Sequence, residues 1–210
     1  MVSDKIITIY VEGGSPAQTG LGPDPAFRKA FNKLFSQAEG VRVKIVMIGP
    51  VGNAPKKLAE ITKQNSPDVV LVDLDGPKNE KKKRIEVYYK GLATDQLFFM
   101  VQMMEAWILS QPEAVRQYAK ENGYVERKAT KCVDICNEIK KQCPEDISKP
   151  DEMLKRALRR CFEKVDAKGK KRLEYRKGKT APDLIMRLEL DKLRLAFEDV
   201  DALVEYLTSI

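Results

Sequence analysis

The stretch that most constrains the fold is VVLVDLDGP, which runs from Val69 to Pro77. A short apolar run bounded by turn residues is typical of a strand buried on both faces, most often in a parallel α/β sheet. Asp73 and Asp75 follow the apolar run, at the end of the strand where open α/β sheets bind ligands. Side chains two positions apart in a strand point to the same side, so both carboxylates could share one divalent cation. The alternative is that they only cap the next element.

Strands alternate with helices over residues 5–110, and this pattern predicts an α/β fold. Helices are predicted from Asp24-Pro25, with Asp24 as the cap, and over Pro55–Lys63. We expect a mostly parallel four-stranded sheet flanked by helices. Besides the Val69 strand, the predicted strands are Lys5–Val11, Val41–Ile48 and Gln96–Met103, the last passing into a helix that carries Trp107 as a core residue.

From about residue 111 the periodicity becomes helical. The predicted helices cover Pro112–Asn122, residues 131–143, a segment from Pro150 and two short segments at the end of the chain. We therefore expect an α/β core over 1–110 and a helical C-terminal extension with a basic loop over 111–210, packed together as one unit.

The net charge of +7 favours a polyanionic partner. The N-terminal sequence does not resemble a secretory signal, and the longest apolar stretch, Leu97–Leu109, is too short to span a bilayer. We expect a cytoplasmic protein with no membrane association.

The sequence contains no histidine and four cysteines. The lack of histidine excludes Ser-His and Cys-His nucleophile schemes and histidine-ligated metals. The cysteines, Cys132, Cys136, Cys143 and Cys161, fit no zinc spacing, and the first three follow helical spacing, so we expect reduced core residues. Catalysis by this chain would have to use carboxylates, lysines or a hard metal ion.

Four carboxylates follow the predicted strands. Glu12 ends the first strand, Asp73 and Asp75 end the third, and Glu105 follows the fourth within an apolar segment that also contains Gln102. In a parallel sheet these side chains gather at one edge, and such oxygen-only clusters suit Mg²⁺ or Mn²⁺. Because a buried carboxylate without a partner is costly, Glu105 should have a partner or line a site.

Two basic runs could contact phosphate groups. The first is Lys78–Arg84, and the second is Lys168–Lys179 with Tyr175 inside it. Aromatic residues among lysines and arginines suit base stacking and phosphate contact. Solvated surface segments are the alternative for both.

Several of these residues match motifs of known protein families. A glutamate after the first strand and a DxD after a later strand resemble the signature of the Toprim fold. Over nearly its whole length, the chain resembles an uncharacterised bacterial family of the Toprim-like group (domain of unknown function 4276), related to the overcoming-lysogenisation-defect nucleases. The matching segments are IYVEGG at Ile9–Gly14, LVDLDGP at Leu71–Pro77, FMVQMMEAWIL at Phe99–Leu109 and YRKGK at Tyr175–Lys179.

The resemblance implies metal-dependent chemistry on nucleic-acid phosphodiesters. It implies Glu12, Asp73 and Asp75 as metal ligands and catalytic residues, with Glu105 as a further catalytic residue. It also implies a partner ATPase in anti-phage defence. The expected substrate contacts are Gly13, Gly14, Gln102, Lys149, Tyr175, Lys177 and Lys179. Family members often carry a histidine after the KG pair, where this chain has Lys179-Thr180-Ala181.

The function predicted from the sequence is Mg²⁺- or Mn²⁺-dependent nuclease activity on DNA or RNA. A Toprim-like subunit that binds nucleic acid or a partner without catalysis is the alternative. VLVDLDGP also resembles the nucleophile motif of haloacid-dehalogenase-like phosphatases, but Pro77, the position of the motif and the lack of a later paired-Asp motif depart from that family.

Overall fold

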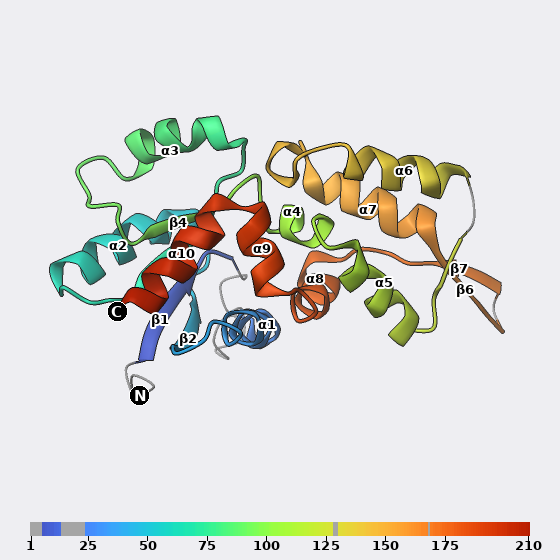
Figure 1. The fold of residues 1–210 in the computed structure, drawn as a ribbon, viewed down its shortest axis with the longest axis horizontal. Coiled ribbons are helices and arrows are strands. Elements are labelled where there is room, and N and C mark those ends of the chain that lie inside the picture. Colours follow the sequence, from blue (N-terminus) through green and yellow to red (C-terminus); the bar gives the residue numbers. More distant parts are fainter. Residues whose placement is uncertain (1–5, 14–23, 128–129, 168) are drawn as a thin grey trace.

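A four-stranded parallel sheet forms the N-terminal half of the computed structural model, which describes residues 6–13, 24–127, 130–167 and 169–210 (Figure 1). Its order is β2-β1-β3-β4, and each neighbouring pair is parallel. This confirms the predicted α/β class. The strands are β1 (Ile6–Val11), β2 (Arg42–Met47), β3 (Val69–Asp73) and β4 (Leu97–Met100).

Three helices connect the strands and cover both faces of the sheet. The chain moves from β1 to β2 and then crosses back to β3 on the other side of β1. Because such crossovers are right-handed, the reversal puts the first helix on one face and the next two on the other. The connections are α1 (Pro25–Phe35), η1 (Val51–Asn53) with α2 (Ala54–Lys63), and η2 (Lys78–Glu80) with α3 (Lys81–Tyr88). The sheet therefore reverses its strand order between β1 and β3.

The two faces bury separate apolar clusters. Leu58 and Ile61 of α2 pack with Val70 and Val72 of β3 on one face. On the other, α1 buries an apolar stripe beside Trp107, which is fully buried and packs edge-on against Phe31. The Asp24 carboxylate accepts a hydrogen bond from the Phe27 backbone N–H at 3.4 Å, as predicted for a cap.

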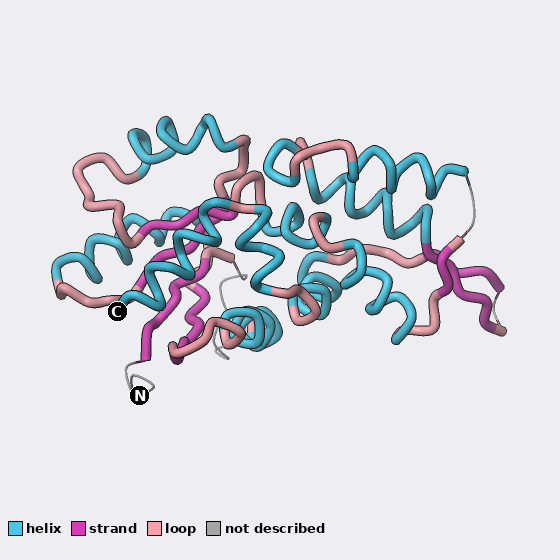
Figure 2. The backbone as a smooth tube through the Cα atoms, viewed as in Figure 1, coloured by secondary structure: helices cyan, strands magenta, loops and turns pink. Residues whose placement is uncertain are grey.

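The C-terminal half is mainly helical and packs against the sheet (Figure 2). Phe98 of β4 contacts Tyr206 of the last helix, with ring centroids 5.8 Å apart, and one hydrophobic cluster contains residues of both halves. No helix in the described parts of the chain is long and apolar enough to cross a membrane. The helices are α4 (Met104–Leu109), α5 (Pro112–Glu121), α6 (Thr130–Lys140), η3 (Pro144–Asp146), α7 (Pro150–Cys161), α8 (Lys177–Ile185), α9 (Leu190–Ala196) and α10 (Glu198–Ser209).

A second sheet, which the sequence analysis did not predict, lies at the end of the molecule away from the first sheet (Figure 1). Its antiparallel strands are β5 (Val125–Glu126), β6 (Phe162–Asp166) and β7 (Gly169–Arg172). The described part of the basic run 168–179 is therefore not one loop, because it forms β7, a short connection and the start of α8. Helix α6 also ends at Lys140, so Cys143 is exposed and not the core residue that was expected.

Candidate functional site

Glu12 and Asp73 meet where the strand order of the sheet reverses. Glu12 directly follows β1, and Asp73 is the last residue of the neighbouring β3. The Glu12 Oε2 accepts a hydrogen bond from the backbone N–H of Asp73 at 3.2 Å. Ligand sites of open α/β sheets lie at this position, outside the carboxyl ends of the strands. The sequence prediction that these two carboxylates lie together is confirmed.

Asp73, at the end of β3, connects the site to helix α4. The Asp73 Oδ1 accepts a hydrogen bond from the backbone N–H of Met104 at 3.0 Å, at the start of α4. The next residue of that helix, Glu105, is fully buried. Asp73 therefore connects the β1 side of the site with the α4 side.

Burial, together with neighbouring carboxylates, raises two pKa values at the site. Burial, followed by the charges of Asp73 and Asp75, raises the pKa of Glu12 to about 7. Burial also raises the pKa of Asp73 to about 7; the Lys177 ammonium opposes this shift, and the charges of Glu105 and Asp75 add to it. A cation bound among these groups would relieve their repulsion.

Glu105 has the buried partner that the sequence analysis required, and that partner is Tyr175. The Tyr175 hydroxyl donates a hydrogen bond to Glu105 Oε1 at 2.7 Å. The Tyr175 ring is 8% exposed, so it does not offer the exposed surface for base stacking that was expected. Glu105 Oε2 is buried and has no hydrogen-bond partner among the residues that the structure describes.

Lys177, the first residue of α8, lies between two of the carboxylates. Its Nζ is 3.9 Å from Asp73 Oδ2 and 3.7 Å from Glu105 Oε1. Burial acts to lower the pKa of Lys177, but the charges of Asp73 and Glu105 outweigh burial and leave the pKa above its ordinary value. Lys177 is therefore a charged partner of these carboxylates, whereas the sequence predicted it as a substrate contact.

Asp75 is near the cluster for a different reason from the one predicted. Strand β3 ends at Asp73, and Asp75 lies in the following loop with φ of 54°, so strand alternation does not align the two side chains. The half-exposed Asp75 carboxylate forms an ion pair with Arg84 at 3.2 Å. Its charge also contributes to the raised pKa values of Glu12 and Asp73.

The remaining predicted residues are more dispersed. Gly13 has φ of 118° and its backbone pairs with Gly49, so it forms the turn after β1, while Gly14 lies outside the described residues. Buried Gln102 donates to the Glu145 backbone carbonyl at 3.0 Å. Lys149 pairs with Glu152 at 3.2 Å, and Lys179 is exposed in the first turn of α8.

Three residues near the site were not predicted as site residues. Arg84 belongs to the basic run 78–84, and its charge lowers the pKa of Glu12. The Tyr89 hydroxyl is buried without a hydrogen-bond partner in the described part of the chain, and burial followed by the Glu12 charge raises its pKa to about 12. Asp151, at the start of α7, is close enough for its charge to raise the pKa of Lys177. No sequence motif marks Tyr89 or Asp151.

The residues predicted as metal ligands, Glu12, Asp73 and Asp75, would supply only carboxylate oxygens. Among the described residues, no three carboxylates have oxygens within 4.8 Å of one another. Mg²⁺ and Mn²⁺ prefer such oxygen donors. A bound cation would lower the raised pKa values of Glu12 and Asp73.

The fold and the site define the class of this protein as an α/β protein with an acidic cluster at the switch point of a parallel sheet. Within that class, the chain belongs to the family described as "Domain of unknown function (DUF4276)", which matches residues 22–208. The matched segment contains Asp73, Asp75 and Glu105, whereas Glu12 precedes it. Comparisons with curated proteins and with solved structures found no match.

Proposed function

We propose that this protein is a Mg²⁺- or Mn²⁺-dependent hydrolase of nucleic-acid phosphodiesters, related to the Toprim-like nucleases. The observation that carries the proposal is the meeting of Glu12 and Asp73 at the switch point of the sheet, both with pKa values of about 7. Groups with strongly shifted pKa values concentrate at functional sites.

The side chains have distinct roles in this proposal. Glu12, Asp73 and Asp75 would hold the cation, which would supply Lewis-acid chemistry at the phosphodiester. In the alternative role for Glu12, its carboxylate is the general base that accepts a proton from the attacking water. Lys177 supplies positive charge next to Asp73, where it stabilises negative charge that develops on the phosphate.

A basic cavity on α7 supports a nucleic-acid substrate. The cavity has a volume of about 690 Å³ and is lined by Arg127, Glu152, Lys155, Arg156, Arg159, Arg160 and Arg172. Lys155, which lines the cavity, pairs with Asp151 at 2.9 Å, and the Asp151 charge raises the pKa of Lys177. We propose that a polyanion follows α7 from the cavity to the carboxylate cluster.

A cleavage assay tests this proposal. The purified chain is incubated with panels of DNA and RNA in Mg²⁺, Mn²⁺ or chelator, alongside Glu12→Gln and a matched control, Glu60→Gln. Glu60 is an exposed carboxylate that pairs with Lys57 on α2. We expect metal-dependent cleavage by the wild type and Glu60→Gln, and a loss of about 10²-fold or more in Glu12→Gln. Equal cleavage by Glu12→Gln and Glu60→Gln would contradict the proposal.

The second candidate function is a binding subunit without catalysis, and the position of Lys177 favours it. The Lys177 ammonium already lies within 4 Å of two site carboxylates and partly compensates their charge. Nucleic-acid binding with no cleavage in any metal, alone or with the partner ATPase implied by the resemblance, would support this function over hydrolysis.

A further inference from the structure

Three cysteine thiols meet on the side of the molecule formed by α6 and α7. Cys132 and Cys136 are one helical turn apart on α6, and Cys161 is the last residue of α7. Their sulfur atoms all lie within 4.8 Å of one another, and all three are free thiols. The spacing along the sequence does not reveal this cluster, because Cys161 lies on a different helix from the other two.

The distances suit a soft metal ion. In a tetrahedral zinc site with Zn–S bonds of about 2.3 Å, the sulfur atoms are about 3.8 Å apart. The three thiols can reach that spacing through side-chain rotation and sub-ångström shifts. Cys132 and Cys161 are buried and Cys136 is half-buried, so the ion would be shielded from water on most sides. The carbonyl end of α7 at Cys161 also favours a positive charge.

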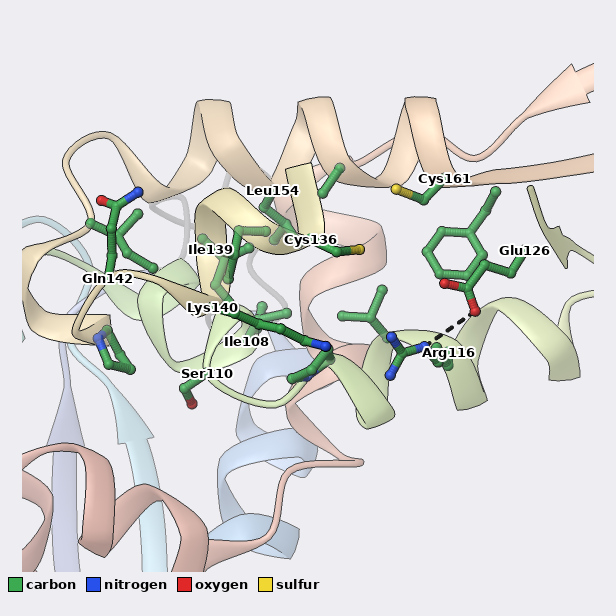
Figure 3. A pocket seen from close by; sticks show the side chains of 17 residues that line it. Ile108, Ser110, Arg116, Glu126, Cys136, Ile139, Lys140, Gln142, Leu154 and Cys161 are labelled. Atoms are coloured by element: carbon green, nitrogen blue, oxygen red, sulfur yellow. Dashed lines mark hydrogen bonds and ion pairs between the residues drawn. The ribbon is translucent and has the colours of Figure 1, made fainter. Parts of the chain in front are cut away.

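A cavity adjoins the cluster and leaves room for a fourth ligand. It has a volume of about 290 Å³, and Cys136 and Cys161 both line it. Figure 3 shows the two sulfur atoms on its upper wall, with Glu126 and Arg116 joined by a hydrogen bond nearby. A water molecule or a small ligand in the cavity can reach the fourth position, as in zinc sites with one open coordination position.

We propose that Cys132, Cys136 and Cys161 bind one Zn²⁺ ion, with the fourth position facing this cavity. The proposal does not depend on the function of the acidic site, because its residues and its ligand chemistry are different. Close packing of cysteines as small apolar residues is the competing explanation of the cluster, and metal uptake distinguishes the two.

The test is metal analysis of the full-length protein, purified under reducing conditions, reconstituted with Zn²⁺ and then passed through a desalting column. We expect one zinc per chain in the wild type. Substitution of Co²⁺ should give the near-ultraviolet charge-transfer absorption of thiolate ligands. Cys136→Ser, at the half-buried position, should lose both signals, and Cys161→Ser provides a second variant.

Cys143→Ser is the matched control, because Cys143 is exposed and outside the cluster. It should keep the zinc and the cobalt absorption of the wild type. A folded wild-type protein that retains no zinc and gives no thiolate absorption would overturn the proposal. Equal zinc in Cys136→Ser and the wild type, or a disulfide among these thiols in place of metal uptake, would overturn it as well.

Discussion

The hydrogen bond between Tyr175 and Glu105 is the contact at the site that is easiest to isolate. It joins a buried hydroxyl to a fully buried carboxylate whose other oxygen has no partner. Tyr175→Phe keeps the ring and removes this donor, so we expect a loss of about 1–3 kcal/mol in the free energy of unfolding. Chemical denaturation of the two proteins measures this loss.

A double-mutant cycle separates the pair from its surroundings. Glu105→Gln keeps an acceptor for Tyr175 and removes the buried charge. We expect Tyr175→Phe to cost less in the Glu105→Gln background, because the group left without a partner is then neutral. Equal costs in both backgrounds would show that the charge of Glu105 is not part of the interaction.

The raised pKa values of Glu12 and Asp73 predict how stability depends on pH. Their ordinary values are 4.5 and 3.8, and both rise to about 7 in the folded protein. Such groups bind protons more tightly when folded, so their stabilising contribution is present at low pH and is lost as pH rises from about 4 to about 7. In the metal-free protein, Asp73→Asn should therefore raise the free energy of unfolding at pH values above about 7.

Thermal unfolding in chelator at about pH 5 and about pH 8 tests this expectation. We expect the Tm difference between Asp73→Asn and the wild type to be larger at the higher pH. Each kcal/mol gained in the free energy of unfolding should raise the Tm by roughly 2–4 °C. Added Mn²⁺ should raise the Tm of the wild type and leave that of Asp73→Asn nearly unchanged. A Tm difference that is the same at both pH values would contradict the assigned shifts.

Individual site residues were predictable where a strand end carried them or, for Glu105, where a carboxylate interrupts an apolar segment. Glu12 and Asp73 follow apolar strands, and the parallel sheet brings strand ends together. Asp75 lies beyond the strand, so its position depends on the loop conformation and on Arg84. Tyr175 is 70 positions from Glu105, so no local sequence pattern predicts that hydrogen bond. The run of lysines and arginines around it instead suggested an exposed surface.

At the scale of elements, Asp199 of α10 connects the C-terminal helix to the edge of the sheet. Its buried carboxylate accepts the Phe99 backbone N–H at 3.1 Å and pairs with Lys81 at 2.7 Å. It therefore occupies a hydrogen-bonding position of edge strand β4 that would otherwise be open. We expect Asp199→Ala to lower the free energy of unfolding by about 3–5 kcal/mol.

The neighbouring residue gives the control for that measurement. Glu198, the first residue of α10, is largely exposed and pairs with Lys78 of η2. Exposed ion pairs contribute about 0–1 kcal/mol, so Glu198→Ala should have little effect in urea denaturation. Similar losses for the two variants would mean that the buried bond to β4 does not hold α10 in place.

Elements were predictable where periodicity was strong. The apolar stripe of α1 and the buried run of β3 define those elements, and the structure confirms them. The antiparallel sheet was missed because β7 has the sequence GKKR, with no apolar alternation. Pairing with β6 and ion pairs of Glu163 with Arg127 and Arg172 stabilise it, and of these contacts only the Arg127–Glu163 pair joins segments distant in sequence.

At the scale of the whole molecule, the basic cavity on α7 predicts where nucleic acid binds. Arg159 and Arg160 line it and are exposed. Reversing both charges with Arg159→Glu and Arg160→Glu should weaken DNA or RNA binding and reduce the salt dependence of the binding constant. Fluorescence anisotropy at several salt concentrations measures both effects.

A charge-matched control comes from helix α1. Arg28→Glu with Lys29→Glu changes the net charge by the same amount at two exposed positions elsewhere on the surface. This control should retain more of the affinity and of the salt dependence. If the two double variants bind equally, net charge and not the α7 cavity determines association.

The central claim is that the carboxylates at the switch point of the sheet perform metal-dependent phosphodiester cleavage. The most direct measurement is the Mn²⁺-dependent cleavage rate of one nucleic-acid substrate by the wild type and by Asp73→Asn. Asparagine can still accept the Met104 N–H but removes one negative charge from the cluster. We predict a fall of about 10²-fold or more in this variant and no cleavage by the wild type in chelator. An unchanged rate in Asp73→Asn, or cleavage without metal, would contradict the account.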